Sequence, residues 1–201
     1  MKVSIFKAVA GALIALASTQ AMADDIQLGQ PAYGGSGCPA GSASAVLSPD
    51  QKSLSILFDQ YITEAGGMSG RRLDRKSCNL AIPVRVPQGY SISVFQVDYR
   101  GYAAIPAGGR GQFNVEYFFA GSQGPRQTKT FNGPTNRQYD LSDRLTAEAL
   151  VWTPCGADTN LRINTGLMVQ TNAAYADALA TVDSADVTAG LVYHIQWRRC
   201  N

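Results

Sequence analysis

Residues 161–169, LRINTGLMV, alternate between apolar and polar or small side chains. One phase consists of Leu161, Ile163, Thr165, Leu167 and Val169, and the other of Arg162, Asn164, Gly166 and Met168. A period of two places successive side chains on opposite faces of an extended strand. One face of such a strand lies in the core and the other in water, as is typical of antiparallel sheets.

The same alternation recurs along the chain. It is found in residues 53–58, 79–86, 112–119 and 191–198. In residues 90–102 the apolar phase changes between Val94 and Phe95, and a β-bulge there would restore one continuous apolar face. Pro83 lacks an N–H, which places its strand at an edge or a bulge. Helix signals are confined to residues 142–150 and 173–180. The sequence therefore predicts an all-β, antiparallel two-sheet sandwich of the jelly-roll or Greek-key kind.

The N-terminus has the features of a secretory signal peptide. Lys2 and Lys7 give a basic start, residues 9–17 are apolar, and residues 21–23 (AMA) form a small-residue cleavage site. Cleavage after Ala23 would release residues 24–201 as a single β-sandwich domain, secreted or periplasmic. The sequence does not decide between the periplasm and the medium.

Charge excludes one broad class of function. Without Lys2 and Lys7, the chain carries 15 basic and 15 acidic side chains, and this balance excludes a strongly basic nucleic-acid binder. Outside the signal peptide there is no apolar run long enough for a membrane-spanning helix, so no membrane span is expected.

The four cysteines are Cys38, Cys78, Cys155 and Cys200. Export leads to an oxidising compartment, and four cysteines allow three pairings. We favour Cys38 with Cys78 and Cys155 with Cys200, because each pair then closes a loop of about 40–45 residues. A four-cysteine zinc site is disfavoured, since no C-x-x-C pair is present.

Several segments together carry a family resemblance. They are residues 33–42 (YGGSGCPAGS), 75–80 (RKSCNL), 97–102 (VDYRGY), 152–156 (WTPCG) and 193–200 (YHIQWRRC). In these segments the chain resembles an uncharacterised family of small secreted proteins of bacteria and fungi, numbered domain of unknown function forty-three sixty. The resemblance implies secretion and the four-cysteine framework, and it supplies no catalytic residue.

The candidate catalytic residues are Asp98, Glu116 and His194. His194 is the single histidine, and a Ser-His-Asp hydrolase would have to use it, but no G-x-S-x-G motif accompanies it. Asp98 and Glu116 lie on predicted neighbouring strands and form the best carboxylate pair for glycoside hydrolysis. A surface histidine and ion-paired carboxylates are the simpler interpretations, so the sequence favours a non-enzymatic protein.

Aromatic residues give the ligand-binding candidates. Tyr99 and Tyr102 lie on one predicted strand, and Phe118 occupies the polar phase of the next. An exposed strip of these rings could stack on sugars, with Arg100 framing a polar groove. Packing in the core is the alternative for the same rings.

Two clusters of charge remain. Asp177, Asp183 and Asp186 could supply oxygen ligands to calcium, although Asp side chains also cap turns, which is the simpler interpretation. Arg71, Arg72, Arg75 and Lys76 form the densest basic cluster, which fits a solvated loop or an anionic partner.

These features favour a non-enzymatic module that binds cell-envelope or extracellular carbohydrate. The alternatives are a protein-interaction, adhesion or inhibitor module and, third, a secreted hydrolase or lyase. The expected partners are envelope polysaccharide or a surface protein, and the sequence leaves the oligomeric state open.

Overall fold

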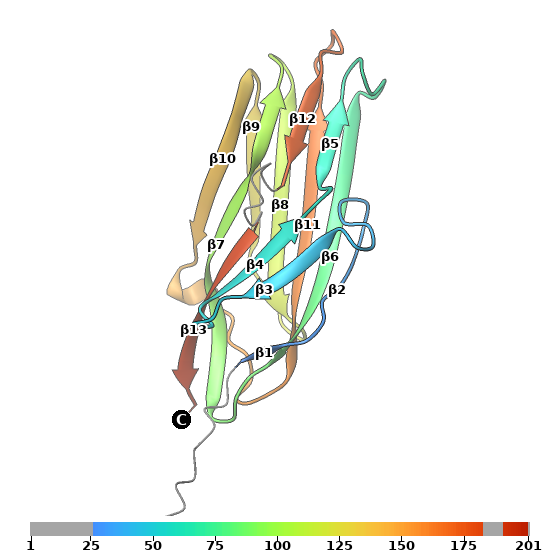
Figure 1. Cartoon of the computed structure of the whole chain (residues 1–201). Coiled ribbons are helices and arrows are strands. Elements are labelled where there is room, and N and C mark those ends of the chain that lie inside the picture. The colour runs from blue at the N-terminus through green and yellow to red at the C-terminus, as the bar shows by residue number, and fades with distance from the viewer. Residues whose placement is uncertain (1–25, 183–190, 201) are drawn as a thin grey trace, which may run out of the picture.

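The alternating segments form strands of two antiparallel sheets, seen in a computed structural model that describes residues 26–182 and 191–200 (Figure 1). Sheet A has the order β1 (Gln27–Leu28), β6 (Leu73–Arg85), β11 (Thr159–Gln170), β8 (Arg110–Phe119) and β9 (Arg126–Asn132), and β2 (Ala32–Gly34) also pairs with β6.

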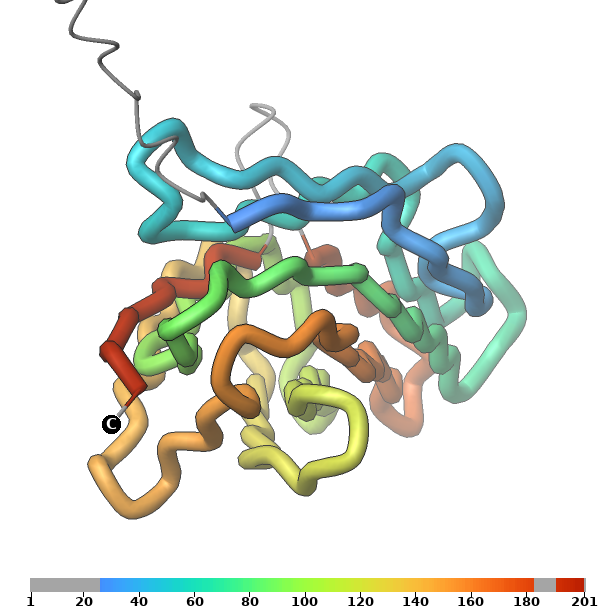
Figure 2. The backbone as a smooth tube through the Cα atoms, turned by 90° about the horizontal axis from the view of Figure 1, so that it is seen from below, coloured from blue at the N-terminus to red at the C-terminus, as the bar shows by residue number. Residues whose placement is uncertain are grey.

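Sheet B has the order β3 (Ala43–Leu47), β4 (Ser53–Phe58), β13 (Leu191–Arg199), β7 (Tyr90–Ile105), β12 (Ala178–Thr181) and β5 (Ile62–Ala65), and β10 (Thr135–Arg144) also pairs with β7. Figure 2 views the same arrangement from below, where the C-terminal strand β13 runs beside the start of β7. The predicted fold class, with two antiparallel sheets and two disulfides, is confirmed.

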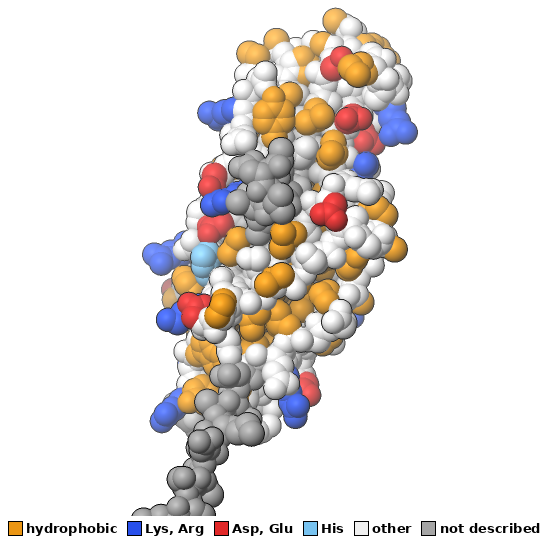
Figure 3. All heavy atoms as spheres, in the orientation of Figure 1, with side chains coloured by type: hydrophobic (Ala, Val, Ile, Leu, Met, Phe, Trp, Pro, Cys, Tyr) orange, Lys and Arg blue, Asp and Glu red, His pale blue; other side chains and the backbone are white. Residues whose placement is uncertain are grey.

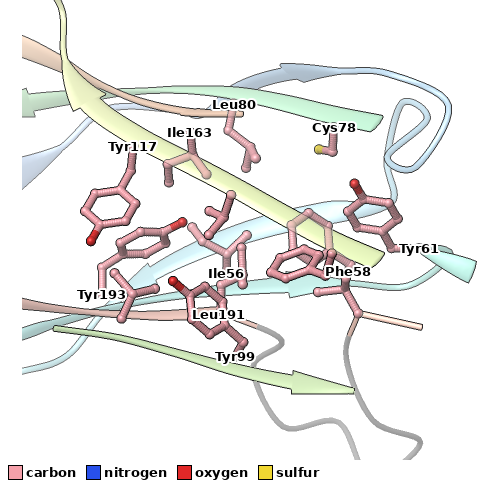
Figure 4. Packing of buried hydrophobic residues seen from close by; sticks show 14 of the residues in the cluster. Ile56, Phe58, Tyr61, Cys78, Leu80, Tyr99, Tyr117, Ile163, Leu191 and Tyr193 are labelled. Carbon is pink, nitrogen blue, oxygen red and sulfur yellow. The ribbon is translucent and has the colours of Figure 1, made fainter. Parts of the chain in front are cut away.

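The core lies between the two sheets and is filled by the apolar phase of each strand (Figure 4). In β11, Leu161, Ile163 and Leu167 are all buried. Tyr117 of sheet A packs edge-on against Tyr193 of sheet B, with ring centroids 5.5 Å apart. Burial of apolar surface is the main stabilising contribution, and these rings supply large areas of it.

The predicted bulge is confirmed at the pairing of β7 with β13. His194 pairs with Gln96 and Ile195 pairs with Val94, so the register passes over Phe95. The extra residue keeps Ile92, Val94 and Val97 all buried. Pro83 also has the expected edge-like position. On the side of β6 away from β11, only the short strands β1 and β2 pair with it, and they do so on either side of Pro83.

The helix predictions are wrong. Residues 142–144 continue β10, and only Ala147–Ala149 form a short 3-10 helix, while β12 occupies Ala178–Thr181. Residues 142–144 pair with residues 96–98 of β7, so pairing in the sheet outweighs a local helical preference. Within the described ranges, no helix is long and apolar enough to cross a membrane.

Both predicted disulfides are present. Cys38 is joined to Cys78 on β6 with a Cα–Cα distance of 5.4 Å, and Cys155 is joined to Cys200 just after β13 with a distance of 6.0 Å. The first bond ties the N-terminal segment to sheet A. The second bond closes the end of the sandwich where β7 begins and β13 ends.

Candidate functional site

The proposed carboxylate pair is separated by the fold. Asp98 lies on β7 in sheet B and Glu116 lies on β8 in sheet A. Their sequence neighbours Val97, Tyr99 and Val115 are buried, so the two carboxylates point to opposite outer faces of the sandwich. The expectation that β7 and β8 are neighbours in one sheet is wrong, because the chain crosses between the sheets at residues 106–109.

Asp98 is instead paired with His194. The imidazole Nε2 of His194 lies 2.6 Å from Oδ2 of Asp98, and Gln96 Nε2 donates to Oδ1 of the same carboxylate over 3.1 Å. Burial acts to raise the pKa of Asp98, but hydrogen bonds from Ser142, His194 and Gln96 outweigh it and lower the pKa below its ordinary value. The pale blue side chain in Figure 3 is this single histidine, at the surface.

The order of these groups does not match a hydrolytic triad. Ser142 donates to the carboxylate of Asp98, whereas a triad needs the imidazole between the hydroxyl and the carboxylate. Ser53 lies directly across from His194 on β4. However, β13 pairs with β4 on one side and β7 on the other, and these ladders use the backbone N–H groups that an oxyanion hole would need.

Glu116 is held on the outer face of sheet A. Its Oε2 accepts a hydrogen bond from Arg126 Nη2 at 3.1 Å and one from Asn164 Nδ2 at 3.4 Å. An ion-paired carboxylate of this kind is the simpler of the two interpretations that the sequence allowed.

The predicted aromatic strip does not form. Tyr99 is 0% exposed and packs against Phe113 in the core, so the prediction that it lines a ligand site is wrong. Tyr102 and Arg100 lie on the outer face of sheet B, where the Tyr102 hydroxyl bonds to Asn136 and Arg100 Nε lies 3.3 Å from Asp140 Oδ2. Phe118 lies on β8 in sheet A, opposite Arg162 of β11. The four residues therefore do not share one surface.

The calcium candidates are only partly described. Asp177 Oδ1 accepts the backbone N–H of Met68 over 3.0 Å, while Asp183 and Asp186 lie outside the described residues. In the part of the chain that the structure describes, no group of three acidic, histidine or cysteine side chains is placed to hold a metal ion. In this structure, Asp177 thus holds its loop to the loop that contains Met68.

A different surface combines the features of a binding site, at the upper end in Figure 1. We call it the apical site: the loops of residues 66–72 and 172–177 with the adjoining hollow between β5 and β6. Tyr175 is 43% exposed, and its ring centroid lies 5.2 Å from the guanidinium carbon of Arg72. Met68 beside it is 92% exposed.

The two apical loops are fastened to each other. Gly67 N–H donates to the carbonyl of Tyr175 over 2.7 Å, next to the bond from Met68 to Asp177. Gly66 permits this approach, since a Cβ at that position would lie 2.6 Å from the Cα of Asp177. Tyr175 itself has φ of 56°, a left-handed conformation that is costly for a large side chain. Backbone strain of this kind is concentrated at functional sites.

The hollow beside these loops is polar and balanced in charge. Its volume is about 240 Å³, and its lining is Ile62, Glu64, Ser69, Arg71, Asp74 and Lys76. Arg71 Nη1 lies 3.3 Å from Asp74 Oδ1, and the other Asp74 oxygen accepts the backbone N–H of Glu64. Two acidic and two basic side chains offer donors and acceptors without favouring either sign of ligand charge. Figure 3 shows hydrophobic and acidic side chains together at this end.

The sequence indicated only part of the apical site. Its basic cluster, residues 71–76, contributes Arg71, Arg72 and Lys76, and its acidic loop contributes Asp177. Tyr175 was missed because it lies in a segment predicted as helix. The signal that points to Tyr175 is the presence of an aromatic residue in a short polar turn between strands, where a side chain does not contribute to the core.

Comparisons with known proteins place the chain in a family. An uncharacterized secreted protein of Arthroderma benhamiae is 36% identical over 178 residues, which is 88% of this chain and 73% of the relative. Among solved structures, TmCBM61 in complex with β-1,4-galactotriose matches 85% of this chain and 88% of its own, at 10% identity and a TM-score of 0.28. That TM-score is too low to establish a common fold, so nothing about this chain follows from it.

The family model described as Domain of unknown function matches residues 24–200, almost the whole chain after the expected cleavage point. The predicted membership of an uncharacterised family is confirmed. The chain therefore belongs to the family named Domain of unknown function (DUF4360).

Proposed function

We propose that the chain is an exported, non-enzymatic module that binds a neutral polysaccharide of the cell envelope or extracellular matrix at the apical site. Export is supported by the signal-peptide features of residues 1–23 and by the secreted relative. The observation that carries the binding function is Tyr175, an exposed ring in contact with Arg72, whose neighbour in the chain, Arg71, lines the polar hollow.

The aromatic ring and the polar hollow suit the apolar face and the hydroxyl groups of a sugar, respectively. The apolar face of a pyranose ring packs on an aromatic side chain, while its hydroxyls need hydrogen-bonding groups at the rim. Arg71, Asp74 and Glu64 supply planar groups with paired donors or acceptors. The hydrogen bond from Gly67 already holds the backbone of Tyr175, so ordering this loop costs little conformational entropy on binding, which favours affinity.

The charge balance of the hollow favours a neutral ligand over an acidic one. The acids Glu64 and Asp74 face the bases Arg71 and Lys76 in one small space. A uronic-acid or phosphate-rich polymer would gain from the bases and lose to the acids in nearly equal measure. Neutral glucan and chitin-type chains avoid this cost.

A second candidate function, hydrolysis, rests on the close contact of His194 with Asp98. Two observations weigh against hydrolysis. The hydrogen bonds do not place His194 between Ser142 and Asp98, and the strand ladders around the histidine use the backbone N–H groups that an oxyanion hole would need. The separation of Asp98 and Glu116 weighs against glycosidase chemistry, which needs both carboxylates on one substrate.

The test is a depletion assay with the oxidised protein of residues 24–201. It is mixed with insoluble peptidoglycan, chitin, cellulose and β-glucan, and both the protein left in solution and the sugar released are measured. We expect depletion by at least one neutral polymer and no released sugar. Released sugar would establish an enzyme, and the absence of depletion by all four polymers would remove the proposed function in favour of a protein partner.

A further inference from the structure

A second polar hollow lies at the opposite end of β6 from the apical site. We call it the basal groove. It consists of two adjoining hollows of about 350 Å³ each, which share Gln27, Arg85 and Asp158. Each is within the size range of small-molecule sites. The groove runs across the ends of β1, β6 and β11, at the lower end in Figure 1.

The floor of the groove is built by Pro83 and Gly29. Gly29 N–H donates to the carbonyl of Pro83 over 2.9 Å, and a Cβ on Gly29 would lie 2.8 Å from the Pro83 side chain. Glycine thus lets the N-terminal segment approach the exposed proline ring closely. Asn160 pairs with Pro83 from the other side, on β11. The result is an apolar floor between polar walls.

The walls carry side chains suited to neighbouring hydroxyl groups. Arg85 Nε lies 3.9 Å from Asp158 Oδ1, and their side chains are 70% and 77% exposed. At that separation and exposure the two groups remain open to a ligand. Gln27 and Asn160 add side-chain amides along the same groove. A guanidinium and a carboxylate can each engage two adjacent hydroxyls, which is the pattern that a sugar presents.

The groove is remote from the apical site along one strand. Asp74 lines the apical hollow and Arg85 lines the basal groove, and both belong to β6. A strand rises about 3.3 Å per residue, so about 36 Å separates the two positions. Ligands at the two sites therefore do not compete for space.

We infer that the basal groove is a second polysaccharide-binding site and that the protein bridges two polysaccharide chains. This inference rests on the proposed function, because it takes the apical site as the first point of attachment. Two sites on one rigid sheet convert a simple binding module into a cross-linker, and each attachment raises the effective concentration for the next.

The test compares binding with bridging. Binding is measured by depletion on insoluble β-glucan and chitin, and bridging by the turbidity that the protein produces in soluble β-glucan and soluble chitin oligomers. The basal variant is R85A with D158A, which leaves the net charge unchanged. Its matched control is R100A with D140A, another exposed Arg–Asp pair, on the outer face of sheet B.

We expect the wild type and the control to produce turbidity. The basal variant should still deplete on the insoluble polymer to within about threefold of the wild type, but lose turbidity by about tenfold or more. All these side chains are exposed, and equal melting temperatures of the variants would exclude a folding defect.

Two results overturn the inference and leave the proposed function standing. They are a wild type that depletes without producing turbidity, and a basal variant that bridges as well as the wild type. A wild type that is depleted by none of the four insoluble polymers named above overturns the proposed function and the inference together.

Discussion

The ring of Tyr175 lies 5.2 Å from the guanidinium carbon of Arg72, although the two residues come from loops far apart in the sequence. The contact joins the loop between β5 and β6 to the loop between β11 and β12. Hydrogen bonds from Gly67 and Met68 to Tyr175 and Asp177 hold the same loops together. The backbone that carries this exposed aromatic ring is therefore held in place before any ligand binds.

The left-handed backbone of Tyr175 predicts an unusual order of stability. With φ at 56°, Tyr175→Gly should be more stable than Tyr175→Ala by about 1 kcal/mol, because glycine adopts this conformation without a steric penalty. Urea denaturation of both variants measures the difference. An alanine variant as stable as the glycine variant would show that the turn is not strained.

The pair of Asp98 and His194 predicts a dependence of stability on pH. The pKa of Asp98 is lowered in the folded protein, so its contribution is present above the ordinary carboxyl pKa and is lost as pH falls through the folded value. Asp98→Asn should therefore lower the free energy of unfolding at neutral pH by at most about 1 kcal/mol, since the group is partly exposed. The difference from the wild type should vanish in acid.

Urea denaturation at a series of pH values measures that dependence. Asp140→Asn, in an exposed ion pair on the same face, is the control and should change stability by about 0.5 kcal/mol or less. A difference between wild type and Asp98→Asn that persists unchanged into acid would contradict the assignment.

Buried tyrosines predict a response to alkali. Burial raises the pKa of Tyr61 to about 12, and burial likewise raises the pKa of Tyr99, Tyr117 and Tyr193 above the ordinary value. The stability contributed by these neutral phenols is complete below a pH of about 10 and decreases as pH rises through the folded values. Phenolate absorbance should show these groups ionising late, together with unfolding. Early ionisation of every tyrosine in a folded protein would contradict their burial.

The second disulfide predicts a large loss of stability. Replacing Cys155 and Cys200 by serine removes the link that closes the end of the sandwich, and should cost about 2–5 kcal/mol. Thermal unfolding with and without reductant measures the loss, and reductant should destabilise the wild type, which has two disulfides, more than this variant, which keeps only Cys38–Cys78. Equal stability of the variant and the oxidised wild type would show that the bond contributes nothing.

Local patterns were sufficient to predict the main strands, the bulge and the disulfides. In residues 161–169, buried positions alternate with more exposed ones because β11 has one face in the core and one in water. The change of phase at Val94 and Phe95 marks the bulge because only an extra residue keeps the apolar face continuous. The two cysteine pairs join residues of similar spacing, and both bonds formed as favoured.

Other features depend on tertiary contacts that a local pattern does not contain. Asp98 and Glu116 are close in sequence, but a crossing between sheets puts them on opposite faces. Alternation assigns Tyr99 to one face of its strand, and the packing of the two sheets makes that face the buried one. Tyr175 becomes a site residue because two distant loops meet, and neither loop alone indicates the contact.

The most direct test of the central claim is a depletion isotherm on the insoluble polymer that retains the wild type, repeated with Tyr175→Ala. The matched control is Tyr102→Ala, which removes a partly exposed ring from the outer face of sheet B. We predict that Tyr175→Ala weakens binding by at least about tenfold, or about 1.4 kcal/mol, while Tyr102→Ala binds like the wild type. Equal affinity of Tyr175→Ala and the wild type would contradict the account.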